Sequence, residues 1–146
     1  MNLDDIDRRI LTALQRNGRM SNSDLSEKVH LSASACHRRV QRLESDGYIR
    51  DYVALLNPRK MGVPTTVFVE ITLQGQADEV LDAFEKAVAR IPDVLECHLM
   101  AGAADYLLKV VAENTEDFAR IHRQHLARLP GVGQMQSSFA LRTVCK

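Results

Sequence analysis

One segment of this 146-residue chain, residues 31–49, places cationic and hydrogen-bonding side chains at helical spacing. If Ser32 caps a helix there, Cys36, Val40 and Leu43 fall on one apolar face. The opposite face is polar and basic and consists of Ser34, His37, Arg38, Gln41 and Arg42. Guanidinium groups form bidentate hydrogen bonds to guanine and pair with phosphates, and hydroxyl and amide groups bond to base edges. The segment therefore has the chemistry of a helix that lies in a groove of duplex DNA.

The polar residues of this segment are predicted to make two kinds of contact with DNA. We expect Ser34, His37 and Arg38 at or near base edges, and Arg39 and Arg42 at phosphates. The full predicted DNA-binding set is Ser23, Ser32, Ser34, His37, Arg38, Arg39, Gln41 and Arg42. The alternative is that the arginines form only a solvated helix face, and the helices and charges around the segment favour DNA contact.

Two earlier segments supply the other helices of a helix-turn-helix. Asp4 is expected to cap the first helix, which residues 17–18 (Asn-Gly) end. The apolar stripe of that helix consists of Ile6, Ile10, Leu11 and Leu14. Ser21, followed by Asp24 three residues later, imitates a capping box and starts a second, short helix before a tight turn at residues 30–31.

The end of the third helix is also marked in the sequence. Gly47 is expected to stop it, and residues 48–55 then bring β-branched and aromatic side chains that predict a strand or small wing. Over residues 57–64, two prolines, a glycine and charged residues interrupt both the helical and the strand periodicity of the sequence. We place a linker there. The first domain, residues 1–56, is therefore predicted to be a winged helix-turn-helix.

The remaining residues, 65–146, alternate between strand and helix patterns. Strands are predicted over residues 66–73, 94–100, 106–111 and 135–144. Helical stripes are predicted at Val80, Leu81, Phe84 and Val88, and at Phe118, Ile121, His125 or Leu126, and Leu129. A weak repeat, Ile-Pro-Asp-Val at 91–94 and Leu-Pro-Gly-Val at 129–132, closes each helix and opens a strand. The order βαββαβ predicts a ferredoxin-like antiparallel sheet with both helices on one face, and hence an α+β protein.

The other face of this sheet needs a cover. Strands that carry Val67, Val69, Leu107 and Val110 cannot leave all these apolar side chains in water. Sheet-to-sheet dimerisation is the economical solution. It also pairs two recognition helices, as the half-sites of a two-fold symmetric DNA site require.

Formal charge is zero overall but divided unevenly along the chain. Residues 1–60 contain 11 Lys and Arg against 8 Asp and Glu, and residues 61–146 contain 8 against 11, so the halves carry +3 and −3. A basic excess fits a polyanionic partner for the first half only.

Cysteine usage and hydropathy indicate the compartment. Cys36, Cys97 and Cys145 are widely spaced and form no CxxC motif. No apolar run approaches the roughly 20 residues that span a bilayer. We therefore expect a soluble, cytoplasmic protein with reduced thiols and no membrane partner.

Three motifs, in this order, resemble those of the Lrp/AsnC family of bacterial and archaeal transcription regulators. They are LDDIDRRIL at residues 3–11, RRVQRLESDGYI at 38–49 and GAADYLL at 102–108. The resemblance covers essentially the whole chain. It implies a DNA-binding head, an amino-acid-responsive βαββαβ (RAM-type) domain, and homodimers that assemble into tetramers, octamers or larger rings. It also implies transcription switched by a small effector, commonly an amino acid.

The resemblance further implies where the effector binds. In the family it lies between subunits, against the turn that carries the Gly-x-x-Asp-Tyr motif and facing the last strand of a neighbour. The matching residues here are Met100, Ala101, Gly102, Ala103, Asp105 and Tyr106, opposite Gln136, Ser137 and Ser138. A glycine turn exposes N–H groups that hold a carboxylate, and Asp105 is a candidate acceptor for an α-ammonium group.

This motif departs from the usual family pattern at Ala103 and Ala104, where an acidic and often an aromatic residue precede the aspartate. Two possible ligand contacts are therefore absent. Without the resemblance, residues 102–105 also fit a simple hairpin turn.

Other classes of function leave weaker signals. His122 and His125, with Cys97 and His98 elsewhere, suggest a metal, but no third ligand has convincing spacing, so we predict no metal and no cofactor besides the amino-acid effector. No Walker A loop, GxGxxG or GxSxG motif is present, which argues against an enzyme. The alternative function is an amino-acid-sensing regulatory subunit of a metabolic enzyme, whose head binds protein instead of DNA.

Overall fold

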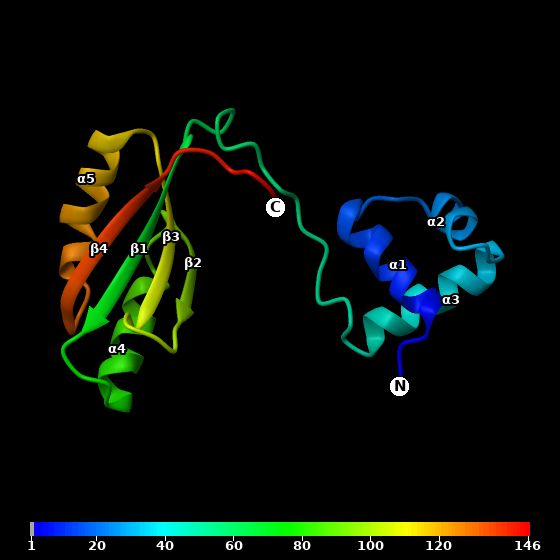
Figure 1. Cartoon of the computed structure of the whole chain (residues 1–146), viewed down its shortest axis with the longest axis horizontal. Helices are drawn as coiled ribbons and strands as arrows, with labels where there is room; N and C mark the ends of the chain where they lie inside the picture. The colour runs from blue at the N-terminus through cyan, green and yellow to red at the C-terminus, as the bar shows by residue number, and fades with distance from the viewer. Residues whose placement is uncertain (1) are drawn as a thin grey trace. The chain divides into compact units, whose positions relative to one another are not determined.

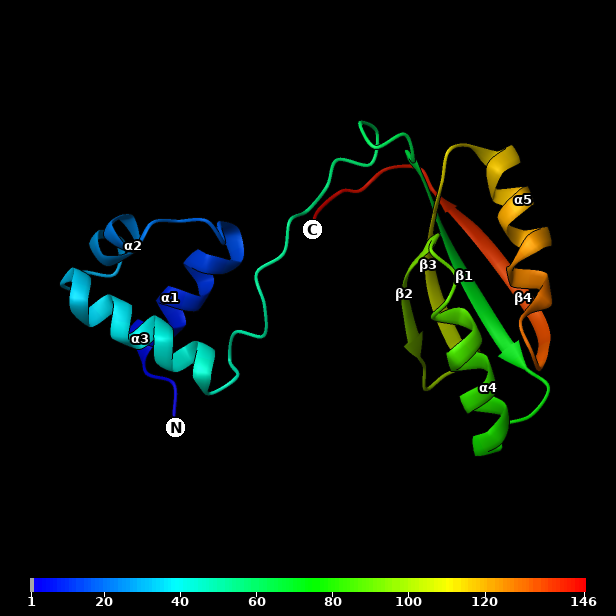
Figure 2. The same cartoon turned by 180° about the vertical axis from the view of Figure 1, so that it is seen from behind.

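The structure, a computed structural model, describes residues 2–146. The chain divides into two compact units, Met1–Leu55 and Leu56–Lys146, each shown from two sides in Figures 1 and 2. Residues 57–64, predicted to be a linker, belong to the second unit. Backbone hydrogen bonds from Met61 to Asn57 and from Val63 to Pro58 fold them into turns.

The first unit consists of three helices, α1 (Asp5–Arg16), α2 (Asn22–Lys28) and α3 (Ala33–Ser45). Each begins as predicted, because the side chains of Asp4, Ser21 and Ser32 accept a hydrogen bond from the N–H group three residues later. The helices share one core, whose buried members are Ile10, Ala13, Leu25, Val29, Cys36 and Leu43. The inner face predicted for α3 is therefore confirmed.

Residues 48–55 form no strand, so the predicted wing strand is wrong. A strand needs a neighbouring strand to hydrogen-bond, and the described part of this unit contains no other. The ring of Tyr52 instead lies beside Gly18, just beyond α1. This partial burial raises the pKa of the Tyr52 phenol.

The second unit contains β1 (Thr65–Leu73), α4 (Asp78–Val88), β2 (Val94–Leu99), β3 (Tyr106–Ala112), α5 (Thr115–Gln124), the 3-10 helix η1 (Leu126–Arg128) and β4 (Val132–Ala140). The strands form one antiparallel sheet in the order β2-β3-β1-β4 (Figures 1 and 2). Side chains of α4 and α5 pack in a single core with one face of this sheet. The βαββαβ prediction is confirmed.

Two predicted boundaries in this unit are wrong. β4 starts and ends earlier than the predicted range 135–144, because β1 offers it pairing partners only from Thr66 to Leu73. The last helix also ends early, at Gln124, and the buried position beyond it is taken by Leu126 in η1.

Alternation along the strands separates a covered face from an open face. Val67, Val69 and Val110 are fully buried under the helices, so their assignment to the other face is wrong. Successive side chains of a strand point to opposite faces, and Leu107 is three residues from Val110. Of the four apolar residues predicted for the open face, Leu107 is therefore the only one that lies there. Phe68, also on the open face, remains 39% exposed. This open face is defined by Thr66, Phe68, Glu70, Leu107, Lys109 and Val111, with Gln136 and Ser138 of β4.

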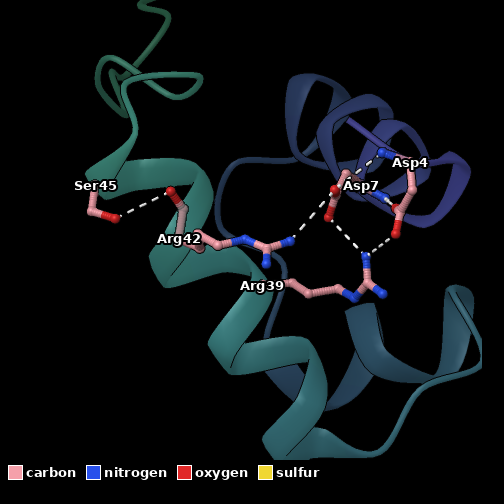
Figure 3. A network of polar contacts seen from close by, with 5 residues as sticks. All are labelled: Asp4, Asp7, Arg39, Arg42 and Ser45. Carbon is pink, nitrogen blue, oxygen red and sulfur yellow. Dashed lines mark hydrogen bonds and ion pairs between the residues drawn. The ribbon is translucent and has the colours of Figure 1, made fainter. Parts of the chain in front are cut away.

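Four charged side chains connect α1 to α3 (Figure 3). The Asp7 side chain is only 1% exposed, and Arg39 Nη1 lies 3.0 Å from its Oδ1. The same Nη1 lies 2.6 Å from Oδ2 of Asp4. Arg42 is held more loosely, with its Nη2 3.8 Å from Asp7 Oδ2. Because a buried carboxylate without a cation is costly, Arg39 is needed to keep α1 packed on α3.

Replacing Arg39 by Met keeps much of the side-chain stem but leaves the Asp7 carboxylate with the distant Arg42 as its only cation among the described residues, in addition to the N–H group of Asp4. We expect the free energy of unfolding to fall by roughly 1–3 kcal/mol, the cost of a buried polar group that loses its partner. Arg42→Met is the matched control, with an expected loss of about 0–1 kcal/mol, because its contact with Asp7 is 3.8 Å long and half of the Arg42 side chain is exposed. Urea denaturation followed by circular dichroism measures both losses, and equal losses would contradict the distinction.

Candidate nucleic-acid interface and ligand site

The outer face of α3 is open to solvent. Its polar residues Ser34, His37, Arg38, Gln41 and Arg42 are all exposed, as the helical spacing predicts. A hollow of about 370 Å³ runs beside this face and is lined by Leu31, Ala35, Arg38, Arg39 and Arg42. Three arginine side chains therefore line this hollow, and a guanidinium that is free of other partners offers planar hydrogen-bond donors to bases and phosphates.

The two serines predicted for DNA contact have different surroundings. The hydroxyl of Ser32 accepts a hydrogen bond from the Ala35 N–H at 3.2 Å and lies 3.4 Å from the Ser34 hydroxyl, so it caps α3. Ser23 is exposed on α2, and its carbonyl accepts a hydrogen bond from the Ser26 hydroxyl. The Ser23 hydroxyl has no partner among the described residues and is free for an external one.

Arg39 differs from the other two arginines of the hollow. Only 25% of its side chain is exposed, and its hydrogen bonds lower the pKa of the Asp4 carboxyl and raise its own. Its guanidinium is thus committed to α1, and the geometry does not support the predicted phosphate contact. Arg42, 52% exposed, and Arg38, which forms no ion pair with the described residues, are the available cations.

Residues 100–105 join β2 to β3 in a loop closed by a 2.8 Å hydrogen bond from the Met100 N–H to the Asp105 carbonyl. Ala101, Gly102 and Ala103 are exposed, and their N–H groups donate to no atom of the described residues. A Cβ at Gly102 would meet nothing within 4 Å, and the φ of this residue is not positive, so neither packing nor backbone requires glycine. The loop presents free N–H donors of the kind that hold a carboxylate.

Asp105 and Tyr106, two predicted ligand contacts, are turned inward. The Asp105 carboxylate is part of a buried residue, 8% exposed, and accepts from the Leu73 N–H and from Gln76 Nε2, each at 2.8 Å. The Tyr106 hydroxyl donates to Glu85 at 2.5 Å, and burial and Glu85 raise its pKa. The geometry does not support the expected role of Asp105 as acceptor for an α-ammonium group, because this buried carboxylate already accepts from the end of β1 and from Gln76.

The three predicted residues of β4 do not share a face. Gln136 and Ser138 lie on the open face, whereas Ser137 pairs with Val69 on the covered face and is directed away from the site. A hollow of about 150 Å³ does bring the loop and β4 together in one chain. It is lined by Glu70, Thr72, Ala103, Ala104, Gln134 and Gln136.

Three of these lining residues, Glu70, Thr72 and Gln134, were missed by the sequence analysis. The available signal was the alternation of Glu70 and Thr72 with buried Val69 and Ile71, which directs both polar side chains to the open face. Glu70 supplies the exposed carboxylate that the buried aspartate does not.

His122 and Cys97, two of the residues considered for a metal, take part in packing. His122 packs edge-on against Phe118, with ring centroids 6.2 Å apart. Burial, with Glu85 nearby, raises the pKa of Cys97 to about 11, which keeps this thiol protonated at neutral pH. No group of three His, Cys, Asp or Glu residues that are described gathers to hold a metal ion.

Within residues 2–146, no helix is long and apolar enough to cross a membrane.

Comparison with protein families gives one match for each unit. Residues 3–50 match the family described as winged helix-turn-helix DNA-binding, and residues 66–146 match the Lrp/AsnC ligand binding domain. Among relatives, the leucine-responsive regulatory proteins of Klebsiella pneumoniae and Escherichia coli strain K12 are each 43% identical over 142 residues. These alignments cover 97% of this chain and 87% of each relative.

Solved structures agree with the family matches. A transcriptional regulator from Neisseria meningitidis in complex with L-Met has a TM-score of 0.93 at 36% identity, over 99% of this chain and 94% of that one. A feast or famine regulatory protein from M. tuberculosis, complexed with L-methionine, has a TM-score of 0.86 at 31% identity, over 99% and 96%. The chain belongs to the Lrp/AsnC family and is a DNA-binding transcription regulator with a ligand-binding domain, not an enzyme.

Proposed function

We propose that α3 reads DNA mainly through Arg38, with Ser34 and His37 beside it, and that Arg42 pairs with a phosphate. The observation that carries this assignment is the exposed guanidinium of Arg38, which has no ion pair among the described residues. On binding DNA, Arg42 gives up only its 3.8 Å contact with Asp7 to pair with a phosphate, and losing such a long contact costs little free energy. Because the partner is DNA, we also infer a cytoplasmic location.

Substitution of Arg38 and Arg42 separates sequence reading from general affinity. A preferred site is first selected from random duplexes, and binding to it and to random DNA is measured over a salt series. Arg38→Ala should cost about 1–3 kcal/mol on the selected site and less on random DNA. Arg42→Ala should weaken both alike and make the log affinity against log salt slope shallower by about 1. Equal loss of specificity in the two variants would reject the assignment.

We propose that an amino acid binds at the loop of residues 100–105. The free N–H groups of Ala101, Gly102 and Ala103 hold its carboxylate, and Glu70 accepts from its α-ammonium group. The hollow in one chain is small and open to the sheet face, so a second subunit completes the site. Two solved relatives hold L-methionine and two others are named leucine-responsive, which makes methionine and leucine the first effectors to test.

A thermal-shift screen of the full chain against the twenty amino acids tests this site. A ligand present at 100 times its Kd stabilises the folded state by about 2.7 kcal/mol, so a true effector raises the melting temperature clearly. Glu70→Gln should abolish that shift, whereas Glu113→Gln, an exposed carboxylate in a loop of the same unit, should keep it. No response to any amino acid, or an unchanged response of Glu70→Gln, would refute the proposal.

We propose that two chains pack through the open face of the sheet, and that such dimers assemble further into tetramers or octamers. Both helices cover the opposite face, and Phe68 stands exposed between the half-buried Leu107 and Val111. An effector bound between subunits then shifts the assembly equilibrium and so the spacing of the DNA-reading helices.

Sedimentation of an open-face variant tests the dimer. Phe68→Asp places a charge in the centre of the proposed interface and should shift the protein to monomers at micromolar concentration. Leu95→Asp, at an exposed apolar position of the edge strand β2, should sediment like the unchanged chain. A Phe68→Asp variant with the unchanged mass would show that this face is not the interface.

A further inference from the structure

A second group of cations lies in the first unit, away from the outer face of α3. Four cationic side chains surround a hollow of about 310 Å³ whose floor is formed by Ala13 and Val29. This basic cluster consists of Arg8, Arg9 and Arg16 of α1 and Lys28 of α2. None of its lining residues lines the hollow beside α3, so the two cationic sites are distinct.

The charges of the basic cluster are not neutralised within the chain. All four side chains are exposed, and none forms an ion pair with any described residue. The carboxylates of Asp4 and Asp7 are already bound to Arg39. Like charges on neighbouring helix positions destabilise the folded chain slightly unless an anion lies between them.

The spacing of these cations fits a linear polyanion better than a single small anion. Arg8 and Arg16 are eight residues apart on α1, roughly 12 Å along the helix axis at about 1.5 Å per residue. Consecutive phosphates of one DNA strand rise about 3.4 Å, so such a row faces several of them. The Thr12 hydroxyl between the two arginines already donates to the Arg8 carbonyl, and the floor is apolar, so apart from the cations themselves the hollow offers no group that could distinguish bases.

We propose that the basic cluster binds phosphates of the DNA backbone, as a second contact zone that adds affinity without sequence preference. This inference rests on the DNA binding proposed for α3. It assigns to α1 and the end of α2 a direct role in holding DNA, in addition to supporting α3. The zone contributes through charge neutralisation and counterion release, and so its contribution falls as salt concentration rises.

The test is a fourfold variant of the full chain, Arg8→Gln, Arg9→Gln, Arg16→Gln and Lys28→Gln, because Gln is a good helix former. The matched control removes the same charge from exposed positions of the second unit by Lys86→Gln, Arg90→Gln, Arg123→Gln and Arg128→Gln. Affinity for the selected site and for random DNA is measured from low to high salt. Circular dichroism and thermal unfolding check that both variants fold.

We expect the cluster variant to bind both DNAs roughly 10- to 100-fold more weakly at low salt, with the salt slope shallower by about 2–4. The ratio between selected and random DNA should stay unchanged, and the control should bind like the unchanged chain. A second variant with the three arginines replaced by Lys should retain most of the affinity, since the charge is kept.

Three results would overturn the inference. One is an unchanged salt slope in the cluster variant, and another is an equal loss in the control, which would indicate a general effect of net charge. The third is loss of binding in the charge-preserving Lys variant, which would indicate damage to α1. Failure of the DNA-binding proposal itself is recognised separately, because the unchanged chain would then show no sequence-selective, salt-sensitive binding at all.

Discussion

A four-stranded sheet has two faces, and this chain supplies helices for only one of them. Val67, Val69 and Val110 are buried beneath α4 and α5, whereas Phe68 remains partly in water on the other side. Each helix crosses this one face to connect two parallel strands that have a third strand between them, α4 from β1 to β2 and α5 from β3 to β4. The open face is therefore the surface that we propose as the interface with a second chain, and the hollow lined by Glu70 and Gln136 lies beside it.

In the first unit, cations that form ion pairs hold the helices together, whereas cations without ion pairs are available to DNA. The buried Asp7 holds Arg39 against α1 and so helps to fix the position of α3 relative to α1. Arg38 and the cations Arg8, Arg9, Arg16 and Lys28 have no such partner and remain available to a polyanion. A modest net charge thus includes two separate groups of cations that form no ion pair with described residues, while Asp4 and Asp7 are engaged by Arg39.

The loop of residues 100–105 shows the same division between support and contact. Its aspartate points inward and satisfies the N–H group at the end of β1, which fixes the loop without using the exposed N–H groups of Ala101 to Ala103. Glu70, on the neighbouring strand, lines the hollow that we propose as the ligand site. The proposed amino-acid site thus combines a set of backbone donors with a strand carboxylate.

The sequence by itself determined the features that depend on near neighbours. Helix starts at Asp4, Ser21 and Ser32, and the strand and helix order of the second unit, follow from caps and periodicity within a few residues. Only the tertiary structure decided the partners of Arg39 and Asp105, because their contacts reach 35 and 32 residues along the chain. The absence of a strand at residues 48–55 was decided in the same way, since a strand forms only where folding provides a neighbour to pair with.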